Sequence, residues 1–120
     1  MDWLKTLELP VVASPMFIAS GPELVIAQCR AGIVGSFPAL NARPSSLLDE
    51  WLVQIETALE PGGRTPGAIR PGPVAVNLIL HKSNTRLYGD LAVCVRRRVP
   101  IIISSVGDPS DLVKEVHGYG

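Results

Sequence analysis

Short apolar runs alternate along the chain with segments of helical periodicity. The runs have the length and β-branched content of buried strands, and they cover residues 11–13, 33–36, 74–80 and 100–104. The helical segments repeat apolar residues at three- and four-residue steps, and they cover about 22–31, 46–59, 85–98 and a short stretch after Ser110. The order of the two patterns predicts four strand–helix units in series.

Polar residues mark where two of these helices begin. Ser20 precedes Glu23 by three residues, and Ser46 precedes Asp49 by the same spacing. This spacing is typical of a capping box, in which the two residues satisfy each other's free backbone N–H groups. We therefore predict that Ser20 and Ser46 are N-caps. The basic run 96–98 closes the third helical segment, where cations complement the helix dipole.

Nearly continuous apolar strands joined by helices indicate an α/β fold with a parallel sheet. Such units occur in doubly wound domains, and four of them fit a free-standing domain of this length. The chain lacks the Gly-x-Gly-x-x-Gly and Walker-type motifs that mark many nucleotide-binding domains of that kind. The other home for such units is a (β/α)8 TIM barrel, which needs about 250 residues. In that case residues 1–120 would be the first half of one barrel domain.

The composition of the chain argues against nucleic-acid binding and membrane association. The 120 residues are 47% hydrophobic and 18% charged, with a formal net charge of zero, which is typical of a globular protein that binds neither nucleic acid nor an anionic membrane. No apolar run reaches the roughly 20 residues that span a bilayer, and we see no signal peptide, so we predict a cytoplasmic protein. The two cysteines, Cys29 and Cys94, have no metal-type spacing and are expected to be small buried residues.

Two regions outside the helices need an interpretation. The loop 61–73 carries Arg64 and Arg70, but it leads from a helix into a strand and should lie opposite any ligand site, so we interpret it as a surface loop. Asn77 is the one polar residue of an apolar strand, and a buried amide must be satisfied. A cofactor edge and a bond to neighbouring backbone are equally compatible with the residue pattern alone.

Four segments in order resemble a known family. They are Val-Val-Ala-Ser-Pro-Met at 11–16, Ala-Gly-Ile-Val-Gly-Ser at 31–36, Val-Ala-Val-Asn-Leu at 74–78 and Ser-Ser-Val-Gly-Asp-Pro at 104–109. Together they resemble the N-terminal part of the nitronate monooxygenases, formerly called 2-nitropropane dioxygenases, over about residues 9–120. The resemblance implies an FMN-dependent barrel that oxidises alkyl nitronates with O2 to a carbonyl compound and nitrite.

The resemblance also implies the site. The loop after the first strand would lie against the isoalloxazine ring through its backbone, and Asn77 would hydrogen-bond the flavin. Ser104, at the end of the fourth strand, would lie at the same end of the barrel. The expected cofactor-binding residues are Ala13, Ser14, Pro15, Met16, Asn77 and Ser104. Many family members have Gly-Gly where this chain has Ser14 and Pro15, so we expect fewer backbone donors there.

Other parts of the family site have no counterpart here. The family's catalytic histidine and phosphate-binding loops lie in the second half of the barrel, and neither His81 nor His117 occupies the catalytic position. We therefore expect the fragment to be inactive alone and to hold FMN weakly or not at all. Two alternatives stay open: a related FMN-dependent enoyl-thioester reductase that uses NAD(P)H, and a non-catalytic α/β fragment. The sequence does not predict the oligomeric state.

Overall fold

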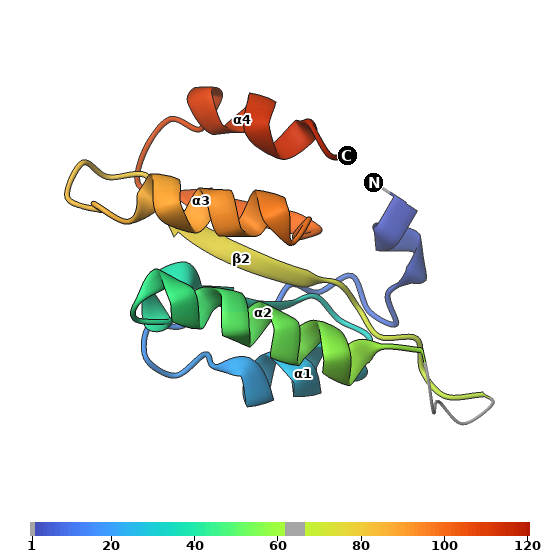
Figure 1. Cartoon of the computed structure of the whole chain (residues 1–120). Coiled ribbons are helices and arrows are strands. Elements are labelled where there is room, and N and C mark those ends of the chain that lie inside the picture. Colours follow the sequence, from blue (N-terminus) through green and yellow to red (C-terminus); the bar gives the residue numbers. More distant parts are fainter. Residues whose placement is uncertain (1, 62–66) are drawn as a thin grey trace.

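The computed structural model describes residues 2–61 and 67–120. In chain order its elements are η1 (Asp2–Thr6), α1 (Pro22–Arg30), β1 (Gly35–Pro38), η2 (Ala39–Asn41), α2 (Ser45–Leu59), β2 (Val74–Ile79), α3 (Leu87–Arg96), β3 (Ile101–Ser105) and α4 (Ser110–His117). The three strands form one parallel sheet of order β1-β2-β3. Figure 1 shows the strand–helix alternation that the sequence predicts.

The predicted first strand is reduced to a bridge. Val12 pairs in parallel with Val34, the backbone N–H of Ala13 donates to the Val34 oxygen at 2.9 Å, and the Val34 N–H donates to the Val11 oxygen at 3.1 Å. Pro15 has no N–H with which to continue the ladder. Residues 11–13 therefore lie beside β1 as a fourth parallel segment, but the prediction of a regular strand there is wrong.

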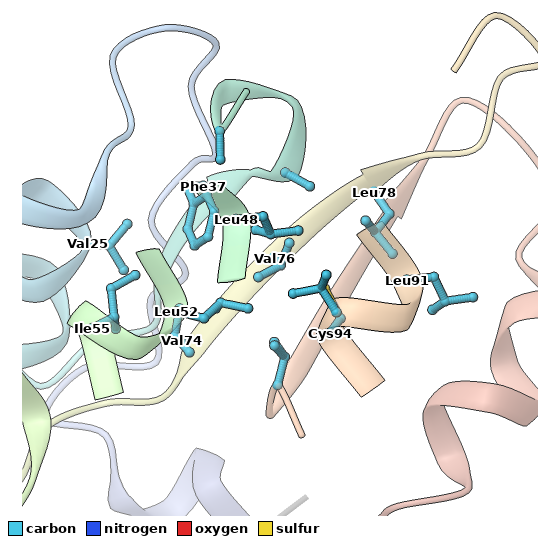
Figure 2. Close-up of a cluster of buried hydrophobic side chains, with 14 of the residues drawn as sticks. Val25, Phe37, Leu48, Leu52, Ile55, Val74, Val76, Leu78, Leu91 and Cys94 are labelled. Carbon is cyan, nitrogen blue, oxygen red and sulfur yellow. The ribbon is translucent and has the colours of Figure 1, made fainter. Parts of the chain in front are cut away.

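The helices cover one face of the sheet. Strands that follow one another in sequence and space, joined by right-handed crossovers, place every connecting helix on the same side. Figure 1 shows α2 and α3 lying across β2 on this side, and Figure 2 shows the apolar side chains packed beneath them, among them Phe37, Leu52 and Val76. A doubly wound domain carries helices on both faces, so this arrangement is that of a barrel wall.

Close packing on the covered face depends on one small residue. A Cβ on Gly35, the first residue of β1, would lie 2.7 Å from both Cys29 Sγ and the Val25 backbone oxygen of α1. Glycine at this position lets α1 approach the sheet. Phe37 is fully buried and meets the partly buried Trp51 of α2 edge-on, with ring centroids 5.6 Å apart.

The two predicted N-caps are wrong. The capping positions of α1 and α2 are Gly21 and Pro44, and neither helix has a side-chain cap bond. Ser20 instead accepts a hydrogen bond from the backbone N–H of Met16 at 2.8 Å through its Oγ. A hydrogen bond within the loop before α1 has therefore replaced the cap that the spacing of Ser20 and Glu23 predicts.

The basic run after α3 has a more specific partner than the helix dipole. Asp49 of α2 accepts hydrogen bonds from Arg97 Nε and Nη2 at 2.8 and 2.9 Å, and from Arg96 Nη2 at 3.1 Å. These bonds, Arg97 first and Arg96 second, hold the pKa of Asp49 well below its ordinary value. These ion pairs connect α2 to α3 at the surface. The predicted capping box would instead have paired Asp49 with the start of its own helix.

Part of the loop 61–73 lies outside the described residues. Arg64 falls there, whereas Arg70 is exposed. Within 2–61 and 67–120, the helices are all too short or too polar to cross a bilayer.

Candidate functional site

Parallel strands bring the loops that follow them to one edge of the sheet. Here these are residues 14–20 after the bridge segment, 39–44 after β1, 80–86 after β2 and 106–109 after β3. In α/β folds ligands bind at this carboxyl edge. In Figure 1 it lies at the arrowhead of β2, and η1 lies at the opposite end.

The face of the sheet without helices carries polar groups. Val76 and Leu78 of β2 belong to the covered core, so the alternation of side chains along a strand directs Asn77 to the other face. In the register of the sheet Asn77 pairs with Ile103, and the next residue on that face, Ile79, pairs with Ser105. We refer to this side, with Ser36, Asn77, Ile103 and Ser105, as the bare face.

Asn77 is held by its neighbours on β3. Its Nδ2 donates to the Ile103 backbone oxygen at 2.9 Å and to Ser105 Oγ at 3.0 Å, and the residue is only 8% exposed. Both amide hydrogens are thereby used, which leaves Oδ1 as the group that can meet a ligand, and Oδ1 can only accept. The bond to neighbouring backbone, one of the two alternatives that the residue pattern allows for Asn77, is therefore present. Asn77 Oδ1 can still accept a hydrogen bond from a ligand N–H.

Ser104 lies away from Asn77. It is in register with Leu78, whose side chain is in the covered core, and it is exposed. The serine beside Asn77 is Ser105, which the sequence interpretation missed by one residue. The predicted strand begins and ends one residue early, and a shift of one residue moves a side chain to the opposite face.

The loop after the bridge segment offers few free backbone donors. The N–H groups of Ala13 and Met16 are bound within the protein, the latter by Ser20 Oγ, and Pro15 has none. The Ala13 oxygen accepts a hydrogen bond from Ser36 Oγ. Contacts from these predicted positions to a ligand would therefore come mainly from side chains and carbonyl oxygens.

Exposed apolar side chains gather on the loops at the carboxyl edge. Met16, Phe17 and Ile18 are 43%, 62% and 81% exposed, and Val106 in the loop after β3 is 65% exposed. Ile18 and Val106 also have positive φ angles of 66° and 60°. This left-handed conformation is strained for β-branched residues, and such strain concentrates at functional sites.

Asn41 organises this loop and was missed in the sequence. Its Oδ1 accepts from the Ile18 N–H at 3.0 Å, and its Nδ2 donates to the backbone oxygens of Met16 and Ser20, each at 3.0 Å. Asparagine is common in turns, so its place after an apolar run gave no signal for a bond 21 to 25 residues away in sequence.

The cysteines and histidines supply no reactive group to this edge. Cys29 and Cys94 are fully buried, as expected. Burial raises the pKa of both thiols, that of Cys94 to about 12 with a further contribution from Asp90. His81 is exposed, with Nδ1 2.8 Å from Ser83 Oγ. Among the described residues, no cluster of three or more histidine, cysteine or acidic side chains could hold a metal ion.

Comparisons with known proteins identify the fold. No family model matches the chain, and no curated protein matches it significantly. Among solved structures, FabK from Thermotoga maritima aligns with 99% of this chain at a TM-score of 0.77 and 24% identity, and its M276A mutant aligns with 99% at 0.75 and 22%. The chain spans 33% and 35% of those two chains. It has the parallel α/β fold of part of a (β/α)8 TIM barrel.

Proposed function

We propose that this chain forms the part of an FMN-dependent oxidoreductase barrel that contacts the flavin ring, in an enzyme of the nitronate monooxygenase type. One observation carries the proposal. The helix-free face of a barrel-type sheet places Asn77 and Ser105, bonded at 3.0 Å, near the edge that carries the strained apolar loop 14–20. The whole protein's reaction, the oxidation of an alkyl nitronate with O2, belongs to this proposal.

The groups at this edge fit an isoalloxazine ring. Such a ring is flat and largely apolar, and its pyrimidine edge carries an N–H between two carbonyl oxygens. Asn77 Oδ1 is an acceptor suited to that N–H, because its amide hydrogens are already given to β3. Met16 is an adaptable apolar side chain that packs favourably against aromatic surfaces. When bound, FMN supplies the redox chemistry.

The chain's own residues bind and orient, and we assign no base among them. Nδ1 of His81 faces the Ser83 side chain and also accepts the Ser83 N–H at 3.2 Å. Both cysteines are buried with raised pKa values. The proton transfers of the reaction would therefore be carried out by groups on other βα units of a complete barrel.

A second candidate is an enzyme of the related barrel family, an FMN-dependent enoyl-thioester reductase that uses NAD(P)H. The likeness to FabK covers 99% of this chain and favours neither candidate. An FMN-dependent enoyl-thioester reductase would use the same flavin-ring contacts. In a polypeptide that joins this chain to the remaining units, anaerobic bleaching of the flavin by NAD(P)H supports the reductase, and bleaching by a nitronate supports the monooxygenase.

A titration of the chain with two flavins tests the proposal. Riboflavin has the same ring as FMN but no phosphate. If this chain supplies ring contacts only, the fluorescence of both flavins should be quenched on binding. The two affinities should be similar and weak, with Kd values above the micromolar range. An FMN affinity at least about tenfold higher, a difference of 1.4 kcal/mol, would place a phosphate site within this chain. The absence of binding by both flavins, to this chain and to a polypeptide that joins it to the remaining βα units, would refute the proposed function.

A further inference from the structure

We propose that Asn41 is a positioning residue that fixes the loop 14–20 in the conformation that meets the flavin ring; this inference rests on the proposed function. Asn41 ends η2, directly after β1, and its side chain reaches the loop after the neighbouring bridge segment. Three bonds of 3.0 Å link it to the backbone of Met16, Ile18 and Ser20. One side chain thus connects the loop after β1 to the loop after the adjacent bridge segment.

The same loop is closed on itself. The Met16 N–H donates to Ser20 Oγ at 2.8 Å, and the Ser20 N–H donates back to the Met16 oxygen at 3.0 Å. Ser20 is fully buried, whereas Met16 is 43% exposed. The backbone of the loop is therefore bound on its inner side while its side chains face outward.

The conformation held by Asn41 is one that the loop would not adopt without support. Ile18 has a φ of 66° and an 81% exposed side chain, so neither backbone preference nor burial of its own side chain favours this position. The bond from its N–H to Asn41 Oδ1 offsets that cost. A loop that only connected two elements would gain by relaxing, so the retained strain indicates a surface kept in place for contact.

Asn41 acts through the loop, since its own polar groups are engaged. Both Nδ2 hydrogens are donated to backbone oxygens, and Oδ1 accepts from Ile18. The surface it presents consists of Met16, Phe17 and Ile18, which suits a flat apolar ring. Loss of Asn41 should therefore weaken flavin contact without removing any group that touches the flavin.

Asn84 provides a matched control. It also holds a loop at the carboxyl edge, donating from Nδ2 to the Ile79 oxygen at 2.8 Å and accepting from the Arg86 N–H at 3.1 Å. Its bonds lie in the loop after β2, and none of them reaches the loop 14–20. A general weakening of the fold should appear in Asn84→Ala as well as in Asn41→Ala.

Two measurements on the whole chain test the inference. Amide hydrogen exchange at Ile18 should become at least about tenfold faster in Asn41→Ala and should not change in Asn84→Ala. Asn41→Asp keeps the acceptor for the Ile18 N–H but removes both donated bonds, so its exchange should be intermediate. The Kd for riboflavin, measured by quenching of its fluorescence, should rise in Asn41→Ala and stay at the wild-type value in Asn84→Ala.

The outcomes separate the inference from the proposed function. Unchanged exchange at Ile18 in Asn41→Ala, or riboflavin affinity equal to that of the wild type, would overturn the positioning role. If neither the wild-type chain nor a polypeptide that joins it to the remaining βα units binds flavin, the proposed function fails and the ligand part of the inference fails with it. Faster exchange in Asn41→Ala would in that case still show that Asn41 holds the loop.

Discussion

The two faces of the sheet are built from the same strands but have different roles: one packs against the helices and the other carries the candidate site. On the covered face Phe37, Val76 and Leu78 are at most 1% exposed and pack against α1, α2 and α3. On the bare face Asn77 and Ser105 bond each other. The period of two along a strand separates these roles, so adjacent residues of β2 contribute to stability or to a site according to the side they face.

The loops repeat this contrast. The apolar residues on the inner side of α2, Leu48, Leu52 and Ile55, are buried, whereas those of the loop 14–20 are exposed and one of them is strained. An apolar side chain gains free energy when it leaves water, and Phe17 and Ile18 gain little of it. Stability of the chain should therefore depend on the covered face and be nearly indifferent to the carboxyl edge.

Truncation of the buried ring should have the largest effect. Phe37→Ala removes a fully buried ring and its contact with Trp51, and it should lower the free energy of unfolding by about 3–5 kcal/mol. Phe17→Ala changes a ring that is 62% exposed and should stay within about 0.5 kcal/mol of the wild type. Urea denaturation measures both, and equal losses would contradict the division between the two regions.

A methyl group added where α1 meets β1 should be the next most damaging change. Gly35→Ala places its Cβ 2.7 Å from a backbone oxygen and a sulfur atom, and overpacking of this kind costs about 1–3 kcal/mol. Gly89→Ala, in α3, would meet only Ser45 Oγ, at an ordinary contact distance of 3.8 Å, and should not lower the denaturation midpoint, because alanine favours a helix more than glycine does. A tolerated Gly35→Ala would mean that α1 packs less closely than described.

Ser104 and Ser105 test which side chains of β3 lie on the bare face. Ser105→Ala removes the Oγ that accepts from Asn77, leaving a buried amide hydrogen unpaired at a cost of about 1 kcal/mol. Ser104→Ala should be near neutral, because Ser104 is exposed in the register of Leu78. The reverse order of these two losses, measured by urea denaturation, would show that the register of β3 is shifted by one residue.

The surface pair between α2 and α3 should have the smallest effect, and one that depends on pH. The pKa of Asp49 is lowered by Arg97 and Arg96 in the folded chain, so its contribution is full above the ordinary aspartate pKa and is lost as pH falls below it. Asp49→Asn should therefore lower the denaturation midpoint slightly at pH 7, and the gap to the wild type should narrow in acid. The gap should also shrink in high salt. The exposed Glu50→Gln is the control, and a gap that persists in acid would contradict the assignment.

The sequence predicted those features that follow from periodicity. The amphipathic pattern around Leu48, Leu52 and Ile55 gave α2, and the apolar runs gave β2 and β3 to within one residue. The repetition of these units predicted a parallel α/β fold, the family resemblance favoured a barrel, and the fold prediction is confirmed.

The features that sequence reasoning missed depend on contacts that the local residue pattern does not determine. Ser20 is a poor predictor of a cap because its hydroxyl is used by Met16. Asn41 is unremarkable in a turn until the loop 14–20 folds against it. The choice between Ser104 and Ser105 required the register of β3, which local patterning does not fix to a single residue.

Residue-resolved mapping of flavin binding tests the central claim most directly. Backbone amide shifts of the chain, followed by NMR during addition of riboflavin, should change at Met16, Asn77 and Ser105 and stay constant at Leu48 and Leu52 of the covered face. Shifts confined to the helical layer would contradict a flavin site on the bare side of this sheet.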